Sequence, residues 1–211
     1  MSLTLAQDLA AFVVAAALLT ITPGLDTAMV LRTAAVEGPR RAALAALGIG
    51  MGCLAWGIAV ALGLGVLLTA SKTAYTVIKW AGAAYLVWMG AGLILKPRKA
   101  FDLAAPASPA AQQSRNWFVR GLITNVLNPK VGVFYVSFLP QFVPAGVATA
   151  PFIVLLAAIH VVLGLIWFAG LIGATAPLKR WLSRGAVVRW LDRVTGGVFL
   201  AFGLKLALDR R

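Results

Sequence analysis

One stretch of the sequence decides the fold: Leu9–Ala35, which reads LAAFVVAAALLTITPGLDTAMVLRTAA. It exceeds the roughly 20 apolar residues that carry a helix across a bilayer. Near its middle, however, stand Pro23 and the acidic Asp26. A proline inside a helix removes one backbone hydrogen bond and clashes with the preceding turn. The stretch therefore predicts a membrane-spanning helix that is broken near its centre.

The composition of the whole chain supports a membrane protein. Of 211 residues, 61% are hydrophobic, 21 more are glycine and only 12% are charged. A globular core of this size cannot bury so much apolar surface, which excludes a soluble enzyme, a disordered protein and a disulfide scaffold. Cys53 is the only cysteine and His160 the only histidine, so we expect no disulfide, no multi-histidine metal site and no cofactor.

Six apolar stretches approach or exceed the length of a membrane span. They run over residues 9–35, 42–68, 74–95, 117–142, 152–175 and 191–208. Residues 96–116, rich in Pro, Ala, Ser and Gln, predict a linker between a first half at 1–95 and a second at 117–211. Because backbone groups in lipid must be paired within their own segment, the predicted fold is all-α.

The placement of positive charge predicts the orientation. Most of the 19 Lys and Arg residues flank three connections, near residues 32–41, 96–120 and 179–193. The positive-inside rule places these connections in the cytoplasm as part of a multi-pass protein, with both termini outside. Since the basic residues form no single patch interleaved with aromatic residues, we expect no nucleic-acid partner.

The two halves share a sequence pattern, which indicates an internal repeat. Phe12-Val13 and Pro23 match Phe118-Val119 and Pro129 at one constant offset. With three spans per half, the second half enters the membrane upside down. The prediction is six transmembrane helices in a 3+3 inverted repeat, with the first and fourth helices broken. Such repeats are typical of secondary transporters.

The breaks supply the candidate substrate site. Thr22-Pro23 and Asn128-Pro129 each match a capping residue followed by the first residue of a new helix. A half-helix starting at Pro23 or Pro129 would direct unpaired N–H groups at a substrate carboxylate, and Gly24 would let it approach the backbone. The alternative is a proline kink whose backbone groups are paired by Thr or Asn side chains.

Asp26 and Lys130 lie deepest in the apolar runs. Each costs at least about 2.5–3.5 kcal/mol at the bilayer centre unless it is paired or hydrated, which makes both functional candidates. Asp26 could carry a proton or bind an ammonium group, and Lys130 could bind a carboxylate. Alternatively, the two form an ion pair that ties the halves together. Asn125 and Asn128 could bind substrate or join helices.

His160, in the fifth stretch, is a second candidate for proton coupling, the alternative being a packed histidine. An enzyme is not expected, because the six acidic residues are scattered and no Gly-x-Ser-x-Gly turn surrounds Ser137.

Three strings resemble a known family, the LysE-type translocators, which include lysine, homoserine, threonine and leucine exporters. They are Thr22–Thr27 (TPGLDT), Ala81–Leu86 (AGAAYL), and Gly121–Lys130 (GLITNVLNPK) followed by Phe138–Phe142 (FLPQF). The resemblance covers essentially the whole chain, although Leu25 stands where the family usually has a second proline. It implies an amino-acid exporter of the bacterial inner membrane, driven by the proton motive force and suspected to be a homodimer.

These observations together predict an alternating-access, proton-coupled exporter of amino acids or close derivatives. The substrate would bind between the first and fourth helices, at Thr22, Pro23, Gly24, Asp26, Asn125, Asn128, Pro129 and Lys130. Two other functions stay open: transport of another small solute, such as a cation or a metabolite, and a non-transporting membrane scaffold.

Overall fold

The computed structural model describes residues 5–70, 72–98, 116–144, 146–174 and 184–208. Every regular element in these ranges is a helix. In chain order they are α1 (Leu5–Ile21), α2 (Leu25–Val36), α3 (Pro39–Ala70), α4 (Lys72–Leu95), α6 (Trp117–Val126), α7 (Pro129–Val133), the π-helical η1 (Phe134–Phe138), the 3₁₀-helical η2 (Leu139–Phe142), α8 (Thr149–Gly173) and α10 (Gly185–Leu208). Most of the predicted linker at 96–116 lies outside the described residues.

Both predicted breaks are present. The axis turns by 52° between α1 and α2, and by 54° between α6 and the segment Pro129–Phe142. Proline explains both positions, because neither Pro23 nor Pro129 can donate the backbone hydrogen bond that would continue the preceding helix. The first and fourth apolar stretches are therefore each two helical segments joined at an angle.

The number of membrane crossings is supported only in part. By length and apolar composition, α3 over Pro39–Gly63 and α8 over Thr149–Gly173 could each cross a membrane, and each bent pair could form one further crossing. Among the described residues these criteria give up to four crossings. The helices α4 and α10 coincide with the third and sixth predicted stretches, but the six-span 3+3 arrangement remains a prediction.

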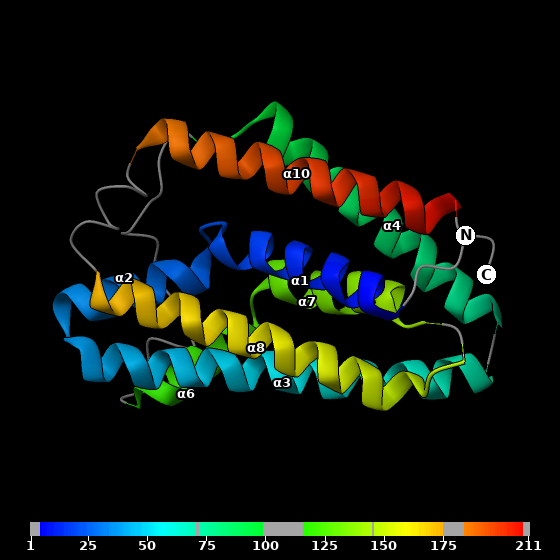
Figure 1. The fold of residues 1–211 in the computed structure, drawn as a ribbon, viewed down its shortest axis with the longest axis horizontal. Helices are drawn as coiled ribbons and strands as arrows, with labels where there is room; N and C mark the ends of the chain where they lie inside the picture. The colour runs from blue at the N-terminus through cyan, green and yellow to red at the C-terminus, as the bar shows by residue number, and fades with distance from the viewer. Residues whose placement is uncertain (1–4, 71, 99–115, 145, 175–183, 209–211) are drawn as a thin grey trace.

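The helices form layers around the breaks (Figure 1). The α4–α10 pair lies along one side, the α3–α8 pair along the other with α6 against α3, and α1 and α7 lie between them. Followed by colour, α1 runs opposite to α7, α3 opposite to α8, and α4 opposite to α10. The α1 and α7 parts of the two broken segments thus lie between the two helix pairs (Figure 1).

Glycines allow the closest helix contacts. A Cβ on Gly121 of α6 would lie 2.0 Å from the Ala45 carbonyl oxygen of α3, and one on Gly48 would lie 1.9 Å from the Phe118 oxygen. The α4–α10 contact is similar, since a Cβ on Gly196 would lie 2.6 Å from the Gly90 oxygen. Such small-residue contacts let helix backbones pack closely in the absence of a hydrophobic driving force.

Two separate apolar clusters flank the breaks. The larger combines α1, η1, η2 and the start of α8, and includes Phe12, Tyr135 and Leu156. The smaller combines α2 with the later part of α8 and the start of α10, and includes Leu31 and Phe168. The polar residues at the breaks, among them Thr22, Asn125 and Asn128, are buried between them.

Candidate functional site

The first break is organised differently from the sequence prediction. The helix α2 begins at Leu25, with Gly24 rather than Thr22 as the capping residue, and Gly24 is extended at φ −153°. Thr22 instead completes α1, because its N–H and its hydroxyl both donate to the Leu18 oxygen, at 3.1 and 2.6 Å. The prediction that a half-helix starts at Pro23 was therefore wrong by two residues. Gly24 has no side chain to cap the new helix, so the first N–H groups of α2 have no side-chain partner there.

The second break follows the prediction. Asn128 caps α7 by accepting a hydrogen bond from the Lys130 N–H at 3.1 Å, and Pro129 is the first residue of the helix. The backbone carbonyl of Asn128 accepts from the Val131 and Gly132 N–H groups. This arrangement fixes the direction in which Lys130 leaves the backbone.

Asp26 lies in the first turn of α2 and has one satisfied and one unsatisfied oxygen. Its Oδ2 accepts a hydrogen bond from Asn125 Nδ2 at 2.9 Å, and the same Asn125 nitrogen lies 3.4 Å from the Cys53 sulfur. Its Oδ1 is buried and accepts no hydrogen bond from any residue that the structure describes. Because a buried unpaired carboxylate oxygen is costly, this atom is a candidate to contact a substrate.

Lys130 reaches back to the end of α1. Its Nζ donates to the carbonyl oxygens of Leu19 at 3.0 Å and Thr22 at 2.9 Å. Those carbonyls belong to the last turn of α1, where a cation also offsets the helix dipole. Asp26 and Lys130 form no ion pair within 4.0 Å, unlike the ion pairs that the described residues do contain. The alternative of a direct Asp26–Lys130 bridge is therefore not what ties the halves together.

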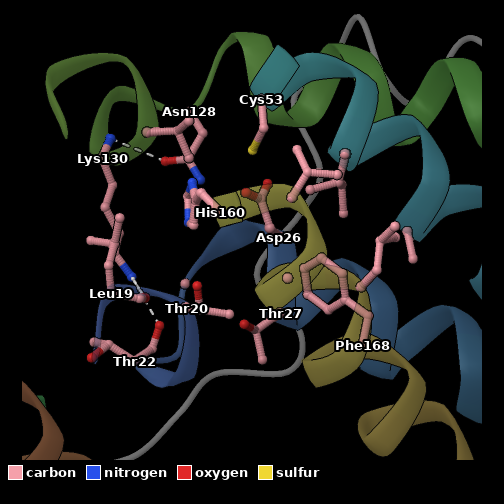
Figure 2. Close-up of a pocket in the computed structure, with 18 residues that line it drawn as sticks. Leu19, Thr20, Thr22, Asp26, Thr27, Cys53, Asn128, Lys130, His160 and Phe168 are labelled. Atoms are coloured by element: carbon pink, nitrogen blue, oxygen red, sulfur yellow. Dashed lines mark hydrogen bonds between the residues drawn. The ribbon is translucent and has the colours of Figure 1, made fainter. Parts of the chain in front are cut away.

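These residues surround a small cavity (Figure 2). Its volume is about 50 Å³, enough for about four water molecules if each needs about 10–15 Å³. One side is polar and comes from the breaks, with Thr22, Asp26, Asn128 and Lys130. In Figure 2 the Asp26 carboxylate points into the space that also holds the Cys53 sulfur and the His160 ring.

A second cavity, of about 480 Å³, lies on the other side of the second break. It is lined mainly by apolar residues of α3, α4 and the α6–α7 region, among them Trp56 and Tyr85. Asn128 lines both cavities. The break in the fourth stretch therefore separates two spaces.

His160 of α8 is buried at the edge of the first cavity. Its Nδ1 lies 2.9 Å from the Tyr135 hydroxyl of η1. π-Helical turns such as η1 occur often at functional sites. His160 is thus both hydrogen-bonded within the core and in contact with the cavity. The structure is therefore compatible with both interpretations, a packed histidine and a proton-coupling one.

The sequence analysis missed a polar contact behind the first break. Asp192 of α10 is fully buried and binds the Arg98 guanidinium through both oxygens. The Arg98 Nη1 also donates to the Pro23 carbonyl at 2.7 Å, and the Thr195 hydroxyl is hydrogen-bonded to that of Thr22. In the sequence, Arg98 is one of the basic residues near 96–120 that predict the orientation. No local signal pairs it with Asp192, which lies 94 residues away.

The structure brings five of the eight predicted substrate residues together at one cavity. Five line the first cavity: Thr22, Gly24, Asp26, Asn128 and Lys130. Asn125 contacts Asp26 from behind, and Pro129 faces the second cavity. The remaining one, Pro23, receives the Arg98 hydrogen bond. Among the described residues no three His, Cys, Asp or Glu side chains gather as a metal ion would require.

Comparison with known proteins identifies relatives over nearly the full length. The family described as LysE type translocator matches residues 17–210. The chain is 30% identical over 209 residues to a Bacillus subtilis protein named uncharacterized membrane protein YrhP, covering 96% of this chain and 100% of that one. No solved structure matches the chain.

Two other relatives carry functional names. The chain is 31% identical over 194 residues to the threonine efflux protein of Escherichia coli K12, covering 90% of this chain and 92% of the relative. It is 29% identical over 201 residues to the homoserine/homoserine lactone efflux protein of Salmonella typhi, with 95% and 96% covered.

Proposed function

Because the chain belongs to the LysE type translocator family, we propose that it is a transporter, not an enzyme, and exports amino acids or close derivatives from the cytoplasm. The names of its threonine and homoserine efflux relatives support amino-acid export. The protein is a membrane protein, and we place it in a bacterial inner membrane. The observation that carries the proposal is the Asp26 Oδ1, which is buried, unpaired within the described residues and directed into a cavity.

The roles at the site follow from its charges. The substrate ammonium binds Asp26, which gives the unpaired oxygen its partner. The substrate carboxylate lies at the start of α2, where the first backbone N–H groups have no side-chain cap and the helix dipole favours negative charge. Lys130 supports this site from the other half by holding the end of α1 through two carbonyls.

The architecture we propose is a six-span 3+3 inverted repeat. The opposite directions of α1 and α7, α3 and α8, and α4 and α10 support it (Figure 1). So do the two bends of 52° and 54° at equivalent prolines. In such a repeat, the central site opens alternately to each side as one half moves against the other.

We propose proton coupling through Asp26 and His160. Both line the same cavity, and His160 is connected to Tyr135 by a hydrogen bond. A proton taken up by Asp26 after substrate release neutralises the carboxylate, so that the empty carrier returns without a buried charge.

The test uses purified protein in liposomes loaded with single radiolabelled amino acids. Export of at least one amino acid is expected from the parental protein, and Asp26→Asn should lose it. Asp8→Asn, near the start of α1 and outside the cavity, is the matched control and should export normally. A panel on which the parental protein moves no amino acid would rule out the proposed function. Parental rates in Asp26→Asn would instead rule out the site and favour a different one.

A further inference from the structure

The first cavity has two chemically different walls. Its polar lining comes from the two breaks and from Cys53 and His160. Its apolar wall includes Ile49 of α3 and Val161, Leu165 and Phe168 of α8. In Figure 2 Phe168 lies on the opposite side of Asp26 from Cys53. A ligand that binds the Asp26 carboxylate must therefore also have a part that contacts an apolar surface.

No charge on this wall could pair with a charged substrate side chain. The titratable groups that line the cavity are Asp26, Lys130, Cys53 and His160, and none of them belongs to the stretch of α8 beyond His160. Lys130 already donates to two carbonyl oxygens. A second ammonium or carboxylate on the substrate would be buried against Ile49 and Leu165 without a partner, which is strongly unfavourable.

Small residues determine how much room the apolar wall leaves. Gly50 is close to its neighbour, since a Cβ there would lie 3.3 Å from Val161 Cγ1. Gly164 lines the cavity as Gly50 does, but a Cβ added to Gly164 meets nothing within 4 Å. The absence of a side chain at Gly164 is thus not required by helix packing among the described residues. It keeps space open beside Leu165.

From these contacts we propose that Ile49, Val161, Leu165 and Phe168 form the compartment for the substrate side chain, that Gly164 sets its size, and that the protein exports uncharged amino acids with aliphatic side chains. This inference rests on the proposed amino-acid export and adds the side-chain class. The cavity of about 50 Å³ is smaller than an amino acid, so the compartment widens when the substrate enters. The side chain then takes the place of water on an apolar surface.

The test measures the ratio of leucine to alanine export in liposomes. Gly164→Ala should lower this ratio about tenfold, because one methyl group in an apolar pocket discriminates by about 10- to 200-fold, and Gly164→Val should lower it further. Gly170→Ala is the matched control on the same helix: its Cβ also meets nothing within 4 Å, and it does not line the cavity. Its ratio should equal the parental one.

A second variant distinguishes a change in specificity from a loss of folded protein. Leu165→Ala enlarges the compartment and should shift export toward longer side chains, the opposite direction from Gly164→Val. Lysine and glutamate should be exported at least tenfold more slowly than leucine by the parental protein. Unchanged ratios in Gly164→Ala and Leu165→Ala, both present in the liposomes at parental levels, would overturn the compartment while leaving amino-acid export intact. Equal export of lysine and leucine would overturn it as well. If no amino acid is exported at all, the proposed function fails and the compartment fails with it.

Discussion

Arg98 and Asp192, 94 residues apart, meet behind the first break in a two-pronged ion pair in which the aspartate is completely buried. The same guanidinium binds the Pro23 carbonyl, a backbone group that the break leaves without a helical partner. One side chain just after α4 therefore joins α10 to the break, at Pro23, three residues before Asp26. A contact outside the cavity thus holds the backbone next to the proposed substrate site.

Removing Arg98 is expected to destabilise the protein strongly. In Arg98→Ala the buried Asp192 carboxylate loses its partner, which should lower the free energy of unfolding by about 3–5 kcal/mol. The double variant Arg98→Ala/Asp192→Ala should lose less, because no unpaired buried charge remains. Denaturant unfolding in detergent micelles measures both.

The exposed pair Arg41–Glu37 is the control for this measurement, since its side chains are 56% and 32% exposed. Glu37→Ala should change the stability by no more than about 1 kcal/mol. Equal losses in Glu37→Ala and Arg98→Ala would contradict the role assigned to Arg98.

The α3–α6 contact should not tolerate a methyl group. In Gly121→Ala the new Cβ would lie 2.0 Å from the Ala45 oxygen and 2.9 Å from its carbonyl carbon. Both are backbone atoms, so the helices must separate, at a cost of about 1–3 kcal/mol or more. In Gly63→Ala, on α3, the new Cβ meets nothing within 4 Å, so this variant should be as stable as the parental protein or more so. Thermal unfolding of the two variants measures this difference. A Gly121→Ala variant as stable as the parental protein would contradict the close α3–α6 contact.

Lys130 is expected to stabilise the protein even when no substrate is bound. In Lys130→Ala the Leu19 and Thr22 carbonyls lose their donor, and each buried unpaired group costs about 1–3 kcal/mol. The loss should therefore be visible in substrate-free protein by thermal unfolding. Lys96→Ala, an exposed lysine just after α4, should cause no such loss. If Lys130→Ala were as stable as the parental protein and only weakened substrate binding, Lys130 would be a direct ligand of the substrate carboxylate.

Two asparagine caps allow stability and transport to be separated. Asn128 and Asn116 each accept a hydrogen bond from a backbone N–H at the start of a helix, at 3.1 and 2.9 Å. Replacing either by alanine should cost about 0.5–2 kcal/mol. Only Asn128 lines the cavities, so only Asn128→Ala should also reduce export at equal protein levels. Equal export defects in both variants would show that the loss at Asn128 reflects stability alone.

Local sequence rules predicted the features that depend on local chemistry. Pro23 and Pro129 gave the positions of both bends, and Asn128 was recognised as a cap because Asn-Pro is a local signature. The rules erred at Thr22, since its hydroxyl prefers the Leu18 carbonyl and Thr195, and the second of these partners comes from α10. The Arg98–Asp192 pair and the carbonyl contacts of Lys130 depend on how distant helices meet. Neither the residue types nor their spacing along the sequence indicates which helices will contact each other.

The Tyr135–His160 hydrogen bond provides the sharpest test of proton coupling. Whichever of the two atoms donates, the bond fixes which His160 nitrogen carries the proton and so what the other nitrogen can do toward the cavity. Tyr135→Phe keeps the ring among Phe134 and His160 but removes the hydroxyl. Export driven by an imposed pH gradient should fall about 5-fold or more, as for an ordinary coupling free energy. Exchange of labelled for unlabelled substrate without a gradient should continue, because it needs no net proton movement.

Tyr85→Phe, in α4 and outside the first cavity, should leave both activities unchanged. If Tyr135→Phe reduced gradient-driven export and exchange equally, the hydroxyl would serve only to hold His160 in place. If it changed neither, His160 would have no part in coupling and Asp26 would remain as the proposed proton carrier. The ratio of the two activities therefore separates a coupling role from a structural one, because a purely structural defect lowers both in the same proportion.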